Sequence, residues 1–175
     1  TFGEVVRTTM VQNAIHSLVN CDTKLITFSD DMDGLRKIPE NIPNRDMLKK
    51  FLGKPLTSIP DPFDKYESFG HHNNAKLKSF LDDFNFEYSF VSSTDKYKNG
   101  DFDGTLILIL ENYQKILEII LPTLRSERKA TYSPFLPISE INGQVLQVKI
   151  DEYKPKECTI VYHDPYNNKQ TETVV

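Results

Sequence analysis

The sequence has few of the residues that build metal centres, disulfide frameworks or glycine-rich phosphate loops. Among its 175 residues there are two cysteines, four histidines, seven glycines and no tryptophan. Cys21 and Cys158 form no C-x-x-C pair, so neither a cysteine zinc site nor a disulfide-stapled secreted domain is expected. This cysteine usage favours a cytoplasmic setting.

Several motifs of known binding and catalytic sites are also missing from the sequence. The chain contains no G-x-x-x-x-G-K-[ST], no G-x-G-x-x-G and no G-x-S-x-G, so P-loop, dinucleotide and hydrolase-elbow sites lack their motifs. The richest apolar run, residues 106–110, is far shorter than the roughly 18 residues of a membrane span, so no membrane partner is expected. A formal net charge of -4 argues against a freestanding binder of DNA or RNA, and any RNA-binding surface must be local.

What is present is a globular composition, 38% hydrophobic and 26% charged, in which helical and strand-like segments alternate. Thr1 and Glu4 have the spacing of a capping box, which predicts a helix that begins there. Apolar residues then recur three and four apart as far as Leu18, which predicts one buried helical face and a helix end near Asn20. Because the first residue is Thr1 and not Met, we expect the chain to be cut at both ends.

The remaining elements are predicted from periodicity and turn residues. Five prolines in residues 39–62 predict an irregular stretch around one short helix. Pro122 is expected to end the longest helical pattern, and Asn142-Gly143 to mark a hairpin before a polar turn at residues 164–170. The predicted helices span residues 45–52, 73–84 and 102–121, and the predicted strands span residues 24–29, 87–92, 135–139, 144–150 and 159–163. This order predicts an α/β fold with a small antiparallel β part at its end.

An acidic cluster follows the first predicted strand. Asp30, Asp31 and Asp33 come just after residues 24–29, and ligands of open α/β sheets bind in the crevice at such strand ends. Carboxylates in that place can bind the amino group of a small substrate. A solvated loop whose acids cap the following turn is the more common alternative.

Two further features have an ordinary structural interpretation beside a functional one. A helix that begins at Thr1 offers unpaired amides that suit a phosphate. The negative charge of Glu4 already interacts with the positive end of the helix dipole, however, and simple capping is the more common role of such a residue. His71 and His72 project about 100° apart on a helix and rarely chelate one ion. We therefore predict helix capping by His72 or Asn73 and assign no metal.

Four long segments carry a resemblance to a known family. They read FSDDMDGLRKIPENIPN (residues 28–44), LGKPLTSIPDPF (residues 52–63), ESFGHHNNA (residues 67–75) and LPTLRSERKATYSPFLPI (residues 121–138). Together they resemble class I lysyl-tRNA synthetases of the bacterial form, and the likeness covers essentially the whole chain. The opening TFGEVVRTTM is similar to the sequence that follows His-Ile-Gly in that family's HIGH-type motif, with Thr1 as its fourth position.

The resemblance implies a partial Rossmann-type catalytic domain in residues 1–100, which in the full enzyme activates lysine with ATP and Mg²⁺ and transfers it to tRNA(Lys). It places Thr1 beside the ATP and makes Asp30, Asp31 and Asp33 candidates to bind lysine. It assigns no catalytic residue to this chain. The rest of the HIGH motif, the KMSKS loop and the anticodon-binding region are absent, so this fragment is expected to be inactive alone.

Residues 101–175 are similar to the connecting insertion of that family, a long helix followed by a small β subdomain. Some members hold zinc there through cysteines, whereas Cys158 has no cysteine partners, so no structural zinc is expected. The insertion would approach the acceptor stem, which makes Arg125, Arg128 and Lys129 candidates for tRNA contact.

Two other interpretations remain open. One is a glutamyl-type or other class I synthetase on the same scaffold, although three acids in one loop suit a cationic amino acid better than an acidic one. The other is a non-catalytic module that binds tRNA or protein through the β part.

Overall fold

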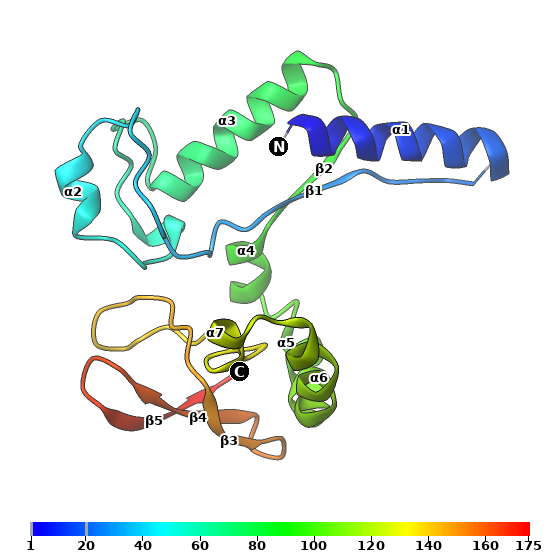
Figure 1. Cartoon of the computed structure of the whole chain (residues 1–175). Coiled ribbons are helices and arrows are strands. Elements are labelled where there is room, and N and C mark those ends of the chain that lie inside the picture. The colour runs from blue at the N-terminus through cyan, green and yellow to red at the C-terminus, as the bar shows by residue number, and fades with distance from the viewer. Residues whose placement is uncertain (1, 20) are drawn as a thin grey trace.

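The computed structural model describes residues 2–19 and 21–175 and shows two regions joined through a short helix, α4 (Figure 1). The first region contains a pair of strands with helices around it. The second contains a three-stranded sheet with helices beside it. Mixed helices and strands confirm the α/β class.

The first region is built on two short parallel strands. Its elements are α1 (Phe2–Val19), β1 (Ile26–Ser29), α2 (Arg45–Lys49), η1 (Leu56–Ser58), α3 (Phe69–Asp83), β2 (Ser89–Ser92) and α4 (Ser93–Lys98). Ile26 pairs with Ser89 and Ser29 with Ser92, so the carboxyl ends of both strands lie side by side. Parallel neighbours require a crossover, which α2, η1 and α3 supply here.

Helix α1 has the predicted bounds but not the predicted burial. Its apolar side chains were expected to form a buried face, yet Met10 is 65% and Leu18 84% exposed. That expectation is wrong for this chain, because α1 extends away from the other helices (Figure 1). Its apolar residues are also spread around much of the helix rather than gathered on one narrow side.

Helix α3 begins earlier than predicted and lies against η1. Ser68 caps it, with its Oγ accepting from His71 N at 3.2 Å, so the predicted cap at His72 or Asn73 is wrong. A Cβ on Gly70 would stand 2.8 Å from Thr57 Cγ2 and 2.9 Å from Thr57 N. Glycine at this position therefore allows α3 and η1 to approach. The core beside them contains Leu35, Leu48, Ile59 and Phe69.

The long helix predicted over residues 102–121 is divided in two. Asn112 separates α5 (Asp103–Glu111) from α6 (Tyr113–Ile120), with φ -106° and ψ 16°. Its Nδ2 donates to Leu108 O at 3.0 Å. Asparagine side chains compete for backbone groups in this way, which explains a helix break that apolar periodicity does not reveal. Two short helices follow, η2 (Leu121–Thr123) and α7 (Ser126–Lys129).

The chain ends in an antiparallel sheet of order β3-β4-β5. Its strands are β3 (Ile150–Lys154), β4 (Thr159–Asp164) and β5 (Lys169–Val174). The predicted hairpin at Asn142-Gly143 is present as an isolated bridge between Ile138 and Val145, with Gly143 at φ 72°. The strands predicted over residues 135–139 and 144–150 are wrong, since these segments form only that bridge and, at Ile150, the first residue of β3. The rest of β3 and all of β5 were not predicted. The sheet shares one core with α5 and α6. The buried residues of this core are Leu110, Tyr113, Phe135, Leu146, Ile150, Ile160 and Tyr162.

Candidate functional site

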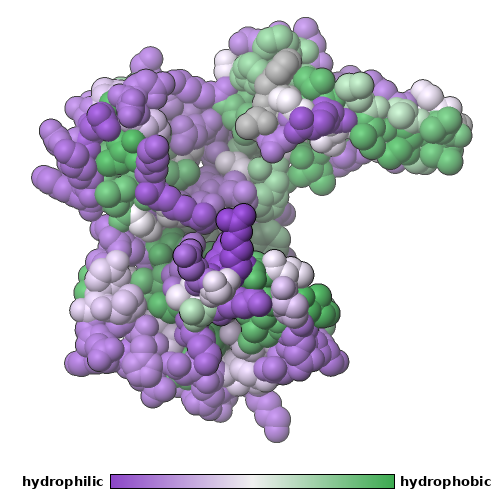
Figure 2. All heavy atoms as spheres, viewed as in Figure 1, coloured by the Kyte–Doolittle hydropathy of each residue, from purple (hydrophilic) through white to green (hydrophobic). Residues whose placement is uncertain are grey.

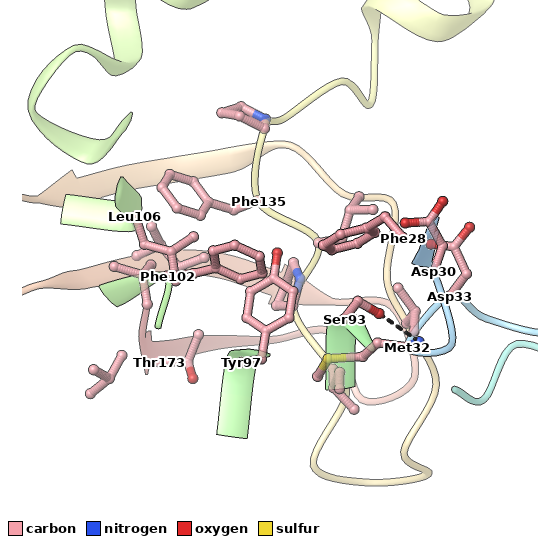
Figure 3. Close-up of a pocket in the computed structure, with 18 residues that line it drawn as sticks. Phe28, Asp30, Met32, Asp33, Ser93, Tyr97, Phe102, Leu106, Phe135 and Thr173 are labelled. Carbon is pink, nitrogen blue, oxygen red and sulfur yellow. Dashed lines mark hydrogen bonds between the residues drawn. The ribbon is translucent and has the colours of Figure 1, made fainter. Parts of the chain in front are cut away.

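A cavity of about 540 Å³ lies between the two regions, at the carboxyl end of β1 (Figure 3). Phe28, Asp30 and Asp33 line one side of it. Residues 134–138 and the end of β5 line the other, so both regions contribute walls. The strand-end crevice predicted from the sequence is therefore a real hollow, and two of the three predicted acids border it.

Asp30 and Asp33 belong to a tight turn at the rim of this cavity. Asp33 N donates to Asp30 O at 3.0 Å, and both side chains are exposed. Figure 3 shows their carboxyl groups close together at one end of the hollow. Arg36 Nη2 lies 3.9 Å from Asp33 Oδ2, with 66% and 57% of the two side chains exposed. Water screens such an exposed ion pair, so Arg36 binds Asp33 only weakly. The carboxylates of Asp30 and Asp33 can therefore both bind a cationic ligand.

Asp31 points away from its neighbours into the protein and is 2% exposed. Its Oδ2 accepts from Asn74 Nδ2 at 2.7 Å and from Ser92 Oγ at 2.6 Å. Its Oδ1 accepts from Ser93 Oγ at 2.9 Å and from Thr94 N at 2.8 Å. Burial raises the pKa of Asp31, but these hydrogen bonds outweigh burial and lower the pKa to about 2. Asp31 is therefore an ionised carboxylate that accepts hydrogen bonds from three side chains and one backbone amide of the protein.

The backbone of the acidic turn is fixed on a second side as well. Thr57 N donates to Asp31 O at 3.2 Å, and Leu56 N donates to Asp33 O at 3.1 Å. Gly34 follows the turn, and a Cβ there would stand 2.7 Å from Gly53 O. The backbone just after the turn therefore lies in close contact with the backbone of residues 53–55.

The same stretch is tied to the β region. Val145 N donates to Gly53 O at 2.8 Å, and Gln144 Nε2 donates to Leu52 O at 2.8 Å. Tyr166 donates its hydroxyl hydrogen to Gln144 Oε1. These bonds hold the wall that contains Val145 against the acidic side of the cavity.

An aromatic wall stands beside the acids. The ring centroids of Phe28 and Phe102 are 6.3 Å apart, and those of Tyr97 and Phe102 are 5.0 Å apart in a T-shaped contact. Met32 and Leu106 also line the cavity. Carboxylates at one end and apolar surface at the other suit a ligand with a cationic group on an aliphatic chain.

The partners of Asp31 were not predicted as site residues, although the sequence contained a signal for them. Ser92 ends β2, and Ser93 and Thr94 follow it directly, just as Asp30 and Asp31 follow β1. Since parallel strands place their carboxyl ends at one edge, residues that follow both strands meet there. The aromatic residues of α4 and α5 carried no comparable signal.

The other predicted site residues are Thr1, Arg125, Arg128 and Lys129. Thr1 lies outside the described residues. Arg125 precedes α7, which contains Arg128 and Lys129, and all three are exposed. None of the three is among the described residues that line the cavity.

A second buried carboxylate lies in the first region, remote from the cavity lining. Asp61 Oδ2 is 2.9 Å from His72 Nδ1, and the carboxylate also accepts from Phe63 N at 3.1 Å and from the amides of Lys65 and Tyr66, each at 3.0 Å. His72 stacks on Phe63, with ring centroids 4.3 Å apart. This pair fixes the loop before α3.

The described part of the chain shows neither a cluster of metal ligands nor a membrane-spanning helix. Within residues 2–19 and 21–175, no three histidine, cysteine, aspartate or glutamate side chains are grouped to hold a metal ion. Cys21 and Cys158 are both free thiols. None of the helices in these ranges is both long and apolar enough to cross a bilayer.

Known proteins are similar to this chain over its whole length. The family model for tRNA synthetases class I (K) matches residues 1–175. The lysine–tRNA ligase of Rickettsia bellii (strain OSU 85-389) is 60% identical over 164 residues, which are 94% of this chain and 31% of the relative. That of Rickettsia conorii (strain ATCC VR-613 / Malish 7) is 57% identical over 168 residues, 96% of this chain and 32% of the relative. The chain thus spans about a third of the length of these relatives.

Proposed function

Since the chain belongs to the family of class I tRNA synthetases (K), we propose that it is part of a lysine–tRNA ligase that works in the cytoplasm. The full-length protein would activate lysine with ATP to lysyl-adenylate and transfer the lysyl group to tRNA(Lys). Relatives that carry this name are 57–60% identical over nearly all of the chain. Because they are about three times longer, the activity is that of the whole protein, and the 175-residue chain alone would be inactive.

The first region would be part of a Rossmann-type nucleotide-binding domain, spanning residues 1–100. Two parallel strands joined through a helical crossover support this proposal, since that unit recurs in doubly wound folds. Residues 101–175 would be the connecting insertion, consisting of a helical segment and a small antiparallel β subdomain.

The cavity at the end of β1 would bind lysine, and one observation carries this proposal: Asp30 and Asp33 border a hollow whose other walls are mostly apolar and aromatic. Carboxylates form charge-assisted hydrogen bonds with an ammonium group, and Phe28 and Tyr97 offer surface to an aliphatic chain. A neutral competitor would leave the acids without a partner, so the site would discriminate against it.

Activation would proceed by in-line attack of the lysine carboxylate on the α-phosphate of ATP. The protein's part in such a step is to position reactants and to stabilise phosphate charge, so no residue of this chain need act as nucleophile or general base. ATP would lie near Thr1, the residue that precedes α1 in the sequence, since the amides at a helix N-terminus suit a phosphate. Mg²⁺ commonly enters such sites bound to substrate phosphates, and the described residues contain no three-acid cluster that would hold it independently.

Contact with tRNA would fall to the second region. Arg125, Arg128 and Lys129 form a small exposed basic group at α7, and cationic side chains of this kind neutralise RNA phosphates. The overall charge of -4 restricts such contact to local surface.

The test is lysine-dependent exchange between ATP and pyrophosphate by the full-length enzyme, with tRNA(Lys) present. Asp30→Ala should raise the KM for lysine by about 10- to 100-fold, because a hydrogen bond to a charged group contributes about 1.5–3 kcal/mol. An unchanged KM for lysine would refute the site.

A panel of lysine, arginine and glutamate in the same assay separates this proposal from a glutamyl-type enzyme, which would exchange with glutamate. Binding of tRNA at low salt by the 175-residue chain, together with a full-length protein that exchanges with none of the three, would favour a non-catalytic binding module.

A further inference from the structure

We infer that Asp31 is a positioning residue, which orients the acidic turn so that Asp30 and Asp33 face the cavity and which does not itself contact the substrate. The inference rests on the proposed lysine site. It gives the central acid a role different from that of its two neighbours.

The hydrogen bonds of Asp31 leave its carboxylate no capacity for a ligand. An ionised carboxylate has about four acceptor positions on its two oxygens. Asn74 and Ser92 donate to Oδ2 at 2.7 and 2.6 Å, while Ser93 Oγ and Thr94 N donate to Oδ1 at 2.9 and 2.8 Å. Four donors thus occupy four positions, and an ammonium group would have to displace one of them.

These donors come from elements that are separate in the sequence. Asn74 lies in α3, Ser92 ends β2, and Ser93 and Thr94 begin α4. Asn74 also receives a hydrogen bond from Ser29 Oγ at its Oδ1, at 2.6 Å. The carboxylate of Asp31 therefore joins the end of β1 to the end of β2 and to two helices.

The turn around Asp31 is held from the same side. Met32 N donates to Ser93 Oγ at 3.2 Å, so Ser93 bonds both to the carboxylate and to the next residue of the turn. With Asp31 directed inwards, Asp30 and Asp33 extend towards the cavity (Figure 3). The direction of the two outer acids thus depends on the inward anchor.

Asp31→Asn is the informative variant, because the amide keeps the shape of the side chain and replaces one acceptor oxygen by a donor. That donor would face groups that themselves donate, so part of the anchor would be lost. In the full-length enzyme we expect the KM for lysine to rise by about 10- to 100-fold, the loss typical of a displaced contact group. The KM for ATP should change less than about twofold, since the proposed ATP position near Thr1 is not part of this turn.

Asp61→Asn is the matched control. Asp61 is also a buried aspartate with backbone and side-chain donors, but it anchors the loop before α3 and borders no part of the cavity lining. Its variant should lower the melting temperature while leaving the KM for lysine unchanged. If Asp31→Asn raises that KM no more than Asp61→Asn does, Asp31 is merely structural and the inference is overturned.

Ser92→Ala and Ser93→Ala provide milder variants that retain the carboxylate. Each removes one donor to Asp31, so each should raise the KM for lysine by a few-fold, which supports positioning. If Asp31→Asn raises that KM and neither serine variant does, Asp31 contacts lysine directly and the inference fails. If Asp31→Asn does not fold, the serine variants alone decide: unchanged KM for lysine in both overturns the inference.

Asp30→Ala in the same assay separates the two proposals. An unchanged KM for lysine in Asp30→Ala refutes the lysine site itself, and the positioning role with it. A raised KM in Asp30→Ala, combined with unchanged values in the Asp31, Ser92 and Ser93 variants, overturns only the positioning role.

Discussion

The two regions of the molecule differ in whether their strands and their longest helix pack on a core, although both regions expose some large apolar side chains. In the second region, helices and sheet enclose one core in which Leu110 is fully buried and Tyr162 is 1% exposed. In the first, the core cluster found among the described residues lies beside α2 and α3, whereas Leu18 on α1 is 84% and Ile26 on β1 is 56% exposed. Figure 2 shows the hydrophobic surface along the arm formed by α1.

This difference indicates that the first region is part of a larger unit. A helix that is apolar on most sides is typical of one buried on several sides, and two isolated strands make an incomplete sheet. A chain that spans about a third of its relatives' length leaves ample sequence to cover these surfaces. The exposure of α1 therefore supports the proposed partial nucleotide-binding domain.

The largest expected effects come from truncating the two cores separately. Leu48→Ala and Leu110→Ala each remove a fully buried side chain and should each lower the free energy of unfolding by about 2–5 kcal/mol. The two cores share no residue, so hydrogen exchange in the 175-residue chain should accelerate in only the region that carries the substitution. Accelerated exchange throughout the chain with either variant would show one cooperative unit instead.

Alanine substitution of one helical glycine in each region should affect stability differently. Gly70→Ala should destabilise the first region by about 1–3 kcal/mol, because the new Cβ would stand 2.8 Å from Thr57 Cγ2. Gly104→Ala is the control, since no atom lies within 4 Å of its Cβ position and alanine favours a helix. Thermal melting of both variants measures the contrast, and equal losses of stability would contradict it.

Elements with strong local signals were predicted well from the sequence. The bounds of α1 and the existence of β1, β2 and β4 followed from periodicity. The break at Asn112 was missed because one side-chain hydrogen bond overrides an otherwise continuous helical pattern. Strand β5 was missed because its polar sequence KQTETV is stabilised as a strand by pairing with β4 rather than by its own composition.

The candidate site was predicted only in outline. The rule that ligands bind at strand ends placed Asp30 and Asp33 at the cavity. The meeting of the two strand ends could have been predicted, but not which of the three acids turns inwards to Ser92, because a turn has no regular alternation of side-chain direction. The exposure of α1 was also unpredictable, since periodicity shows which residues are apolar but not what covers them.

Acid should destabilise the first region before the second. Hydrogen bonds outweigh burial and lower the pKa of Asp31 from 3.8 to about 2, and the pKa of Asp61 is lowered by the same balance. The stability contributed by these groups is fully present above their unfolded-state pKa of about 3.9 and is lost as the pH falls towards their folded-state values. Hydrogen exchange at pH 5 and at about pH 3 should show earlier opening around α3 than in β3-β4-β5.

The matched variants Asp31→Asn and Asp61→Asn should reduce this pH dependence, because each removes one titrating group. If the first region opens at the same pH in both variants and in the original chain, the two buried aspartates do not control its acid sensitivity.

The exposed end of α1 should give the smallest effect. Leu18→Ser should change the free energy of unfolding of the 175-residue chain by less than about 0.5 kcal/mol, because an 84%-exposed side chain has little packing to lose. In the full-length protein the same substitution should lower thermal stability by several degrees if further sequence covers α1. Ser17→Ala, also exposed on α1, is the control and should be neutral in both proteins. A neutral Leu18→Ser in the full-length protein would mean that this end of α1 stays in water, and only the two-stranded sheet would then support a larger domain.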